Sequence, residues 1–301
     1  MGLPTPQARA RFCKLRLRVS GLRPEPQQRA TVSIFHLSVS SISRSQGRSA
    51  CAASAYRWGR LGGPITDERL GETFHYPRKR AVVYAGLVGW DGDNASLWNR
   101  AEATERRRNS VVAREVQVAI PRELALDSQI ELAVAFATFL RETHGVAVDV
   151  AVHNPRARDG KSQPHAHLLM TTRRVSEDGT FGEKTRELDS LKSRSANVEL
   201  IRASWAAMRN AALEDAGAAD RVDHRSYARQ GVDKEVVHVE RAAIALEERG
   251  IATAAVAESN RAANRNARRK SQHAAASNIA TETTELNDSR QQDRGVRQRS
   301  R

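Results

Sequence analysis

The spacing of apolar residues changes between two periods along the chain, which predicts a mixture of strands and helices. Apolar residues three and four apart indicate an amphipathic helix over 127–145, which ends at Gly145. Alternating or β-branched runs indicate strands over residues 31–41, 114–121, 146–153 and 164–175. Only the short polar segment 154–163 joins the last two strands, so an antiparallel hairpin can bring them together.

The remaining patterns are weaker and predict a helical chain with one irregular stretch. Residues 64–95 are rich in turn-forming residues, with one strand expected within 81–90. Further helices are predicted over residues 49–61, 94–113, 196–216 and about 233–249. From about residue 257 onward the composition is dominated by Ala, Asn, Arg, Gln and Ser, which indicates a solvated helix or a disordered tail.

Three histidines lie where the predicted hairpin would bring its strands together. Side chains two residues apart on a strand point to the same face, so His165 and His167 project together. His153 ends the preceding strand and can lie beside them. Three converging imidazoles form a facial metal site with open positions for water or substrate. The alternative interpretation is three polar residues on the exposed face of a sheet.

A metal ion held by neutral imidazoles keeps most of its charge, which suits it to polarise a phosphodiester. The nucleophile could then be water or a side chain that stores the bond covalently. Of the four tyrosines, Tyr56 is notable because small residues precede it and Arg57 and Arg60 follow it. Small residues let a phosphate backbone approach, and arginines can hold it. By itself, however, a tyrosine on a helix is usually a core or interface residue.

Charge and cysteine content narrow the class of protein. The 301 residues carry a formal net charge of +14, which favours a polyanionic partner such as nucleic acid. Most of this excess lies in residues 1–30 and 257–301. Two cysteines without a C-x-x-C spacing exclude a disulfide framework or zinc ribbon. With no apolar run long enough for a membrane span and no secretory signal, we expect a soluble cytoplasmic protein.

Four segments, in order, resemble the MobA/MobL (MobQ-type) plasmid mobilisation relaxases, which are single-tyrosine members of the HUH endonuclease superfamily. The first holds Tyr56, the second the block around Glu115, the third the histidines, and the fourth closes the resemblance, which spans roughly residues 33–250. The segments are "IFHLSVSSISRSQGRSACAASAYRWG", "LWNRAEATERRRNSVVAREVQVAIP", "VAVHNP…QPHAHLLMTTRRV" and "VDHRSYARQGVDKEVVHV". Four motifs in family order are far more specific than one H-x-H.

The resemblance implies an α+β fold in which helices flank a central antiparallel sheet that carries the histidine hairpin. It implies that Tyr56 is the nucleophile, and that His153, His165 and His167 hold a divalent metal ion, Mg²⁺ or Mn²⁺. Glu115 corresponds to an acidic position that lies near the metal or orients a histidine; a strand-end salt bridge is the alternative. The expected reaction is strand-specific nicking of origin-of-transfer DNA through a 5′-phosphotyrosyl intermediate, followed by rejoining.

The resemblance also implies partners: single-stranded or supercoiled origin DNA, relaxosome accessory proteins, and a conjugative coupling and secretion apparatus. Arginines around the site are expected to neutralise DNA phosphates. These are Arg44, Arg48, Arg57, Arg60, Arg173 and Arg174. Two other functions stay open, namely a metal-dependent phosphoesterase that uses water and a non-catalytic DNA-binding or regulatory protein.

Three regions are expected along the chain. Residues 33–250 form the predicted relaxase domain. Residues 1–32 precede the motifs as a basic extension, which translation upstream of a natural start near Val32 would explain. Residues 251–301 form a basic tail that is disordered or loosely helical. Because most of the net charge lies in these ends, the middle of the chain must be judged on its motifs.

Overall fold

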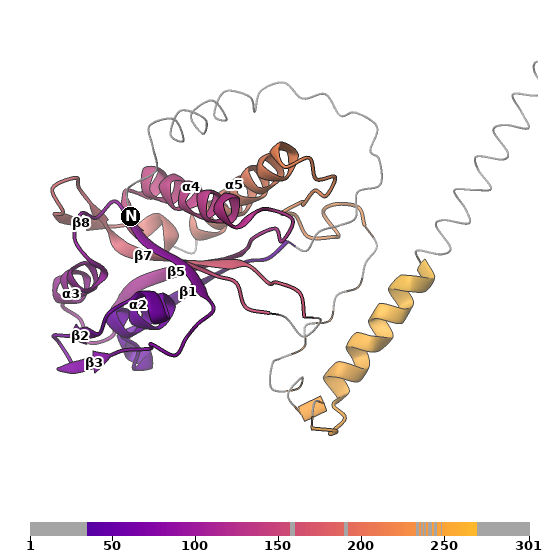
Figure 1. Ribbon diagram of the computed structural model, residues 1–301, viewed down its shortest axis with the longest axis horizontal. Coiled ribbons are helices and arrows are strands. Elements are labelled where there is room, and N and C mark those ends of the chain that lie inside the picture. The colour runs from indigo at the N-terminus through magenta and orange to yellow at the C-terminus, as the bar shows by residue number, and fades with distance from the viewer. Residues whose placement is uncertain are drawn as a thin grey trace, which may run out of the picture. The chain divides into compact units, whose positions relative to one another are not determined.

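The computed structural model describes residues 35–269, apart from 157–159, 190–191 and several positions between 233 and 248 (Figure 1). The predicted helix over 233–249 lies largely outside the described residues, as do the basic N-terminal extension and the end of the tail. The chain divides after His224 into two compact units. The predicted relaxase domain extends past this division to residue 250.

The first unit contains eight described strands and four described α-helices. The strands are β1 (Leu37–Ser43), β2 (Ile65–Asp67), β3 (Glu72–Phe74), β4 (Val82–Val88), β5 (Val111–Ala119), β6 (Val146–His153), β7 (His165–Val175) and β8 (Phe181–Lys184). The helices are α2 (Ala50–Trp58), α3 (Asn94–Thr104), α4 (Leu126–His144) and α5 (Arg194–Asp215). Short 3-10 turns cover Arg44–Gln46, Gly59–Leu61 and Arg186–Leu188.

A central antiparallel sheet organises this unit, as expected. Its strand order is β1-β5-β7-β6-β4, with β8 paired to β7. The neighbours β6 and β7 form the predicted hairpin, and β5 pairs with the other side of β7. The two histidine-bearing strands therefore lie at the centre of the sheet, where hydrogen bonds on both sides hold them.

Helices cover the sheet on two opposite faces, with α4 and α5 on one side and α2 and α3 on the other (Figure 1). Alternation along β6 explains the division. Val146, Val148, Val150 and Val152 belong to the apolar cluster with α4 and α5. Ala147 belongs to the smaller cluster with α2 and α3. The intervening odd-numbered positions of β6 include Asp149 and end at His153, so the polar chemistry lies on the α2/α3 face.

Several predicted boundaries were wrong, each for a local reason. The helix predicted over 94–113 ends at Thr104, because the backbone turns at 105–110 and Val111 already begins β5. The stretch 64–95 contains the hairpin β2–β3 in addition to the expected strand, β4. The helix predicted over 49–61 is split, since α2 ends at Trp58 and continues as a 3-10 turn.

The second unit is described most completely over residues 254–269, which form a helix. Arg265 forms exposed ion pairs with Glu235 and with Glu258 of the same helix. This is the solvated helix that the composition allowed. Within the described part of the chain, no helix has the length and hydropathy needed to cross a membrane.

Candidate active site

The three histidines predicted from the hairpin converge at one end of the sheet. His153 is directly opposite His165 in the β6–β7 register, and His167 lies opposite Ala151. The ring centroids are 4.6 Å apart for His153 and His167, 5.1 Å for His165 and His167, and 5.3 Å for His153 and His165. One ring nitrogen from each lies within 4.8 Å of the other two. The side chains are therefore placed for a common ligand.

Each imidazole is held through one ring nitrogen by a neighbouring oxygen. His167 Nδ1 is 2.7 Å from Glu115 Oε1, and His165 Nδ1 is 3.0 Å from the carbonyl of Gln163. His153 Nε2 is 2.7 Å from the carbonyl oxygen of Arg57. A histidine that donates one N–H to a carboxylate or carbonyl presents its second nitrogen as a ligand, which is the usual arrangement at metal sites.

The local electrostatics favour neutral imidazoles. Burial lowers the pKa of His153 to about 3. The hydrogen bond to the Arg57 carbonyl opposes this shift, and the charges of His167, Lys79 and His165 add to it. Burial also lowers the pKa of His165. Neutral imidazole is the form that binds a metal ion. The donor set, its spacing and its supporting hydrogen bonds therefore fit a divalent cation.

Glu115 connects the histidines to helix α2. Burial by itself would raise the pKa of this carboxyl, but hydrogen bonds from His167 and Arg57 hold it well below its usual range. Arg57 donates from Nε to Oε1 at 2.7 Å and from Nη2 to Oε2 at 2.5 Å. Glu115 thus contacts a histidine and also forms a buried salt bridge, although it lies in the middle of β5 and not at a strand end.

Helix α2 presents Tyr56 beside this cluster. Ser49 caps the helix N-terminus by accepting a hydrogen bond from the amide of Ala52. The Tyr56 side chain is 50% exposed. It borders a hollow of about 380 Å³ that is also lined by Ala52 and Ala53, and by residues of the β2–β3 hairpin. A small-residue surface beside an exposed phenol leaves room for a DNA backbone.

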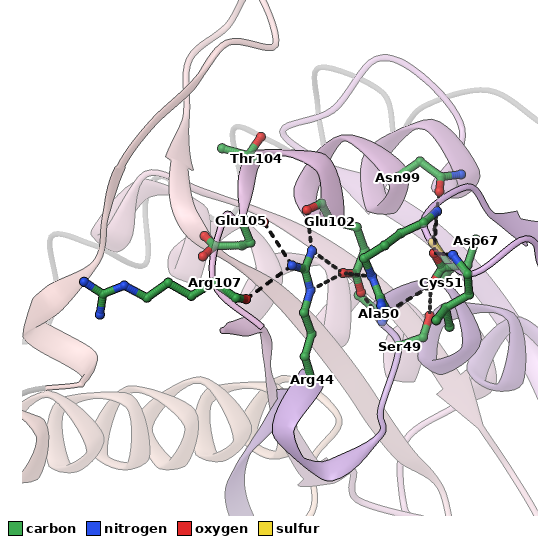
Figure 2. A network of polar contacts seen from close by, with 12 residues as sticks. Arg44, Ser49, Ala50, Cys51, Asp67, Asn99, Glu102, Thr104, Glu105 and Arg107 are labelled. Atoms are coloured by element: carbon green, nitrogen blue, oxygen red, sulfur yellow. Dashed lines mark hydrogen bonds and ion pairs between the residues drawn. The ribbon is translucent and has the colours of Figure 1, made fainter. Parts of the chain in front are cut away.

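A buried polar network fixes the N-terminal end of α2 (Figure 2). Glu102 on α3 accepts hydrogen bonds from the Ala50 amide at 3.0 Å and from Arg44 Nε at 2.9 Å. The Ser49 hydroxyl donates to Asp67 at 2.6 Å. The helix start is therefore tied to α3 and to β2, which are distant in sequence.

The C-terminal half of α2 is fixed by Asp149, which lies fully buried under the helix. Its carboxylate accepts hydrogen bonds from the Ser54 hydroxyl and the Trp58 indole, both at 2.6 Å, and from the Trp98 indole at 2.8 Å. Burial raises the pKa of Asp149, and these three donors oppose that rise. One carboxylate thus joins the sheet to α2 and α3.

Arg57 joins the two parts of the site, since it follows Tyr56 directly in the chain. Its carbonyl oxygen receives the hydrogen bond from His153, while its guanidinium binds Glu115, which in turn contacts His167. The helix that carries Tyr56 is therefore docked on the histidine cluster by main-chain and side-chain contacts of one residue.

The six arginines expected to bind DNA are not gathered around the site. Arg57 is buried, and Arg44 is almost buried against Glu102, so both have internal partners. Arg173 pairs with Glu105, and Arg174 pairs with Glu187. The last two lie near the end of β7, eight or more positions from His165, which is roughly 26 Å at the usual rise per strand residue. Arg173 and Arg174 therefore do not lie beside the histidines, and a contact of either with DNA phosphates stays a prediction.

The remaining two arginines lie close to Tyr56. Arg48 lines the hollow beside the tyrosine, and the exposed Arg60 follows one turn after it. Arg48 donates to the carbonyl of Ser41, and Arg60 donates at longer range to that of Val82. A guanidinium that spends one donor on a carbonyl has four more, so both can still bind a phosphate.

Sequence reasoning overlooked the turn that packs over Tyr56. Tyr76 contacts the Tyr56 ring edge to face, with centroids 5.2 Å apart, and the Lys79 ammonium lies 3.4 Å from the ring centroid. The available signal was Pro77 in "HYPRK", a turn former directly before the β4 strand. Nothing in the local pattern indicates that this turn reaches α2.

The residues of this site lie in a part of the sequence that is similar to known proteins. The family model described as the MobA/MobL family matches residues 48–249, which include Tyr56, Glu115 and all three histidines. The chain belongs to the MobA/MobL family. Both halves of the site, the tyrosine helix and the histidine hairpin, lie within the residues that the MobA/MobL family model matches.

Individual named proteins are also similar to this chain. Mobilization protein MobL of Acidithiobacillus ferridurans is 38% identical over 247 residues, which cover 72% of this chain and 65% of the relative. The 43 kDa relaxation protein of Salmonella typhimurium is 33% identical and covers 50% of this chain and 45% of its own length. The chain thus matches less than two thirds of either relative.

A solved structure supports the fold. It was determined for the molecular basis of vancomycin resistance transfer in Staphylococcus aureus, and it is 29% identical to this chain with a TM-score of 0.56. The match covers 65% of this chain and all of the other. The predicted α+β architecture, a central antiparallel sheet flanked by helices, is confirmed.

Proposed function

We propose that this chain is a mobilisation relaxase that nicks and rejoins origin-of-transfer DNA through a covalent bond to Tyr56. The observation that carries the proposal is the docking of the exposed tyrosine helix on the histidine cluster through Arg57. Family membership and a relative described as a relaxation protein support it. The net charge of +14 suits a DNA substrate.

In the proposed reaction, the Tyr56 hydroxyl oxygen attacks one phosphorus of the DNA backbone. A bond forms between that oxygen and phosphorus, and the bond from phosphorus to the 3′-oxygen breaks. The phenol loses its proton, and the 3′-oxygen leaves as a hydroxyl after it gains one. The product is a 5′-phosphotyrosyl end, so the bond energy is retained and the free 3′-hydroxyl can reverse the step without a nucleotide cofactor.

The histidines would hold a divalent metal ion, for which Mg²⁺ and Mn²⁺ are the candidates. Such an ion would supply Lewis-acid stabilisation of charge on the phosphate. Glu115 would keep His167 oriented, and the carbonyl of Arg57 would do the same for His153. In this scheme Arg57 acts within the protein and not on the DNA, because its guanidinium is already paired with Glu115.

The DNA contacts fall to exposed cations near the tyrosine. Arg48 and Arg60 are placed to hold phosphates beside the scissile one, and the hollow next to Tyr56 offers space for the strand. Arg44, Arg173 and Arg174 are paired with carboxylates, so in this scheme they do not contact the scissile phosphate. Accessory proteins of a relaxosome and a coupling apparatus remain the partners that the family resemblance implies.

One assay tests the proposal: incubation of the full chain with supercoiled origin plasmid and Mg²⁺ or Mn²⁺. A relaxase leaves protein covalently attached to a 5′ end. A phosphoesterase would leave free ends, and a DNA-binding protein would leave the plasmid intact. Tyr56→Phe removes one oxygen and keeps the ring, so we expect loss of the adduct by at least about a thousandfold, with oligonucleotide affinity within a few-fold.

The metal part of the proposal has its own test in the same assay. His153→Ala, His165→Ala and His167→Ala should each remove one ligand and lower adduct formation sharply, about 10- to 100-fold or more. Mn²⁺ titration should show weaker activation in these variants than in the wild-type protein. Undiminished adduct formation in EDTA would contradict the metal assignment and leave the Tyr56 assignment standing.

A further inference from the structure

A lysine outside the recognised motifs is held against the proposed nucleophile. The Nζ atom of Lys79 lies over the face of the Tyr56 ring, 3.4 Å from its centroid. Tyr76, three residues earlier, packs its ring edge to face on the same phenol. The turn between β3 and β4 therefore contacts Tyr56 with both an aromatic ring and a cation.

Backbone hydrogen bonds also hold the Lys79 turn against the end of helix α2. The Lys79 amide donates to the carbonyl of Tyr76, and the Lys79 carbonyl accepts from the amide of Arg60 just beyond α2. Gly59 ends the helix with φ of +50°, and a Cβ there would lie 2.8 Å from the Lys79 carbonyl oxygen. A side chain at position 59 would push the turn away, so the glycine permits the close approach.

The surroundings of Lys79 leave its charge directed at the phenol. In the described part of the chain, no carboxylate forms an ion pair with it. Burial, followed by the charge of Arg57, lowers the pKa of Lys79 to about 8, while Glu115 opposes this shift. From β6 and β7, His153 and His165 also face it, since its charge lowers the pKa of both imidazoles.

We propose that Lys79 stabilises the negative charge that the Tyr56 phenol acquires as it attacks the phosphodiester. This inference rests on the proposed function, because it needs Tyr56 to be the nucleophile. A cation over a neutral ring is attracted only by the ring quadrupole. As the oxygen loses its proton, negative charge spreads into the ring, and the attraction strengthens. An interaction that is stronger in the transition state than before it accelerates the reaction.

The same contact also positions the phenol. Tyr76 packs on the ring at an interplanar angle of 85° and Lys79 lies over its face, while Tyr56 stays 50% exposed. A purely positional role and a charge-stabilising role predict different results when the charge is removed and the packing kept. Lys79→Met keeps an unbranched chain of similar length, whereas Lys79→Arg keeps the charge.

The test measures adduct formation by the full chain at saturating origin oligonucleotide over pH 6–9. We expect Lys79→Met to lower the maximal rate at least about tenfold, equivalent to about 1.4 kcal/mol, while oligonucleotide affinity stays within threefold. The difference from the wild-type rate should be largest at pH 6–7 and should shrink toward pH 9, because a pKa of about 8 leaves Lys79 mostly uncharged there. Lys79→Arg should retain the rate within about threefold. Arg78→Met, which removes an exposed charge from the same turn, is the matched control and should stay near the wild-type maximal rate.

A second measurement separates charge from packing. Difluorotyrosine at position 56 supplies a more acidic phenol, which needs less help to carry negative charge. If Lys79 stabilises that charge, the substitution should narrow the gap between Lys79→Met and the wild-type protein. An equal effect of fluorination in both backgrounds, or a Lys79→Met rate equal to wild type, would overturn the proposal.

Failure of the two proposals can be told apart. If the wild-type protein forms an adduct that Tyr56→Phe abolishes, the proposed function stands whatever Lys79→Met does. If Tyr56→Phe still forms the adduct, or the wild type forms none, both proposals fall, because there is then no attack by Tyr56 to assist. Thermal melting of each variant confirms that the compared proteins are folded, and Lys79→Arg keeps the test informative if Lys79→Met is not.

Discussion

The two faces of the central sheet are built from different kinds of contact. On the α4/α5 face, valines of β6 pack against Leu132, Phe136 and Leu140 of α4 and Ile201 and Trp205 of α5. On the α2/α3 face, the apolar cluster is smaller and is interrupted by buried charge. Asp149, Glu102 and the Arg57–Glu115 pair all lie there.

The difference separates stability from placement. Apolar burial is non-directional and scales with area, so the α4/α5 face stabilises the fold without fixing any atom closely. Buried ion pairs contribute little net stability but tolerate few arrangements, because an unpaired buried charge is costly. The proposed reaction needs the position of Tyr56 relative to the histidines to be fixed closely, because a misplacement of about 1 Å can cost a large part of the rate. The α4/α5 face also buries polar groups, namely Gln129, His144 and Arg209, but the buried carboxylates that hold helix α2 lie on the face that carries the chemistry.

The largest stability change should come from the α4/α5 face. Phe136 is fully buried, with its ring 4.8 Å from Trp205 and 5.9 Å from Phe139. Phe136→Ala should lower the free energy of unfolding by about 3–5 kcal/mol through lost burial and a residual cavity. Urea unfolding measures this. The rate of adduct formation per folded molecule should stay within about twofold, and a drop as large as that of an α2/α3 variant would contradict the division between the faces.

Asp149→Asn should lower stability less than Phe136→Ala does and lower adduct formation more. The substitution places an NH₂ group opposite at least one of the donors from Ser54, Trp58 and Trp98, so a buried N–H or O–H loses its acceptor. We expect about 1–3 kcal/mol of lost stability and a larger relative loss of adduct formation than Phe136→Ala causes. Trp98→Phe and Trp58→Phe, which each remove one donor, serve as matched variants. Adduct formation that simply follows the folded fraction would show that Asp149 is only a stabilising residue.

Local periodicity was enough to predict the parts of the molecule that depend on near neighbours. The strand over 146–153 and the helix ending at Gly145 were predicted with the bounds that the structure has at those points. The convergence of the histidines followed from period-two alternation and a hairpin, both of which are local rules. The helix over 94–113 was predicted too long because charged and β-branched residues after 104 fit either a helix or a turn followed by a strand.

Partners distant in the sequence could not be predicted. An arginine beside a tyrosine suggests a phosphate ligand, yet Arg57 is paired with Glu115, 58 positions away. Likewise Arg44 is bound to Glu102 and does not face solvent. The sequence gives no indication of which cations meet a buried carboxylate, because that depends on how α2 and α3 pack on the sheet. The contact of Lys79 with Tyr56 was missed for the same reason.

The smallest expected effect is a dependence of stability on pH that differs between the two faces. Burial lowers the pKa of His153 to about 3 on the α2/α3 face, and it lowers the pKa of His144 at the end of α4. The unfolded chain protonates its histidines near pH 6.5. As pH falls from 6.5 to 5, the unfolded chain therefore takes up a proton at His153 that the folded protein does not, which lowers stability by up to about 1.4 kcal/mol per pH unit. The lowered pKa of His144 contributes a loss of the same sign.

Urea unfolding in EDTA at pH 7, 6 and 5 should show this loss in the wild-type protein. His153→Asn should flatten the dependence by about one proton, and His144→Asn should flatten it in the same direction, so acid sensitivity alone does not distinguish the faces. Mn²⁺ at pH 7 should, because an ion that binds only the folded protein raises its melting temperature. The increase should persist in His144→Asn and be lost or strongly reduced in His153→Asn. An equal increase in melting temperature in both variants would show that the ion does not bind at the histidine cluster, and it would contradict a metal site on the α2/α3 face.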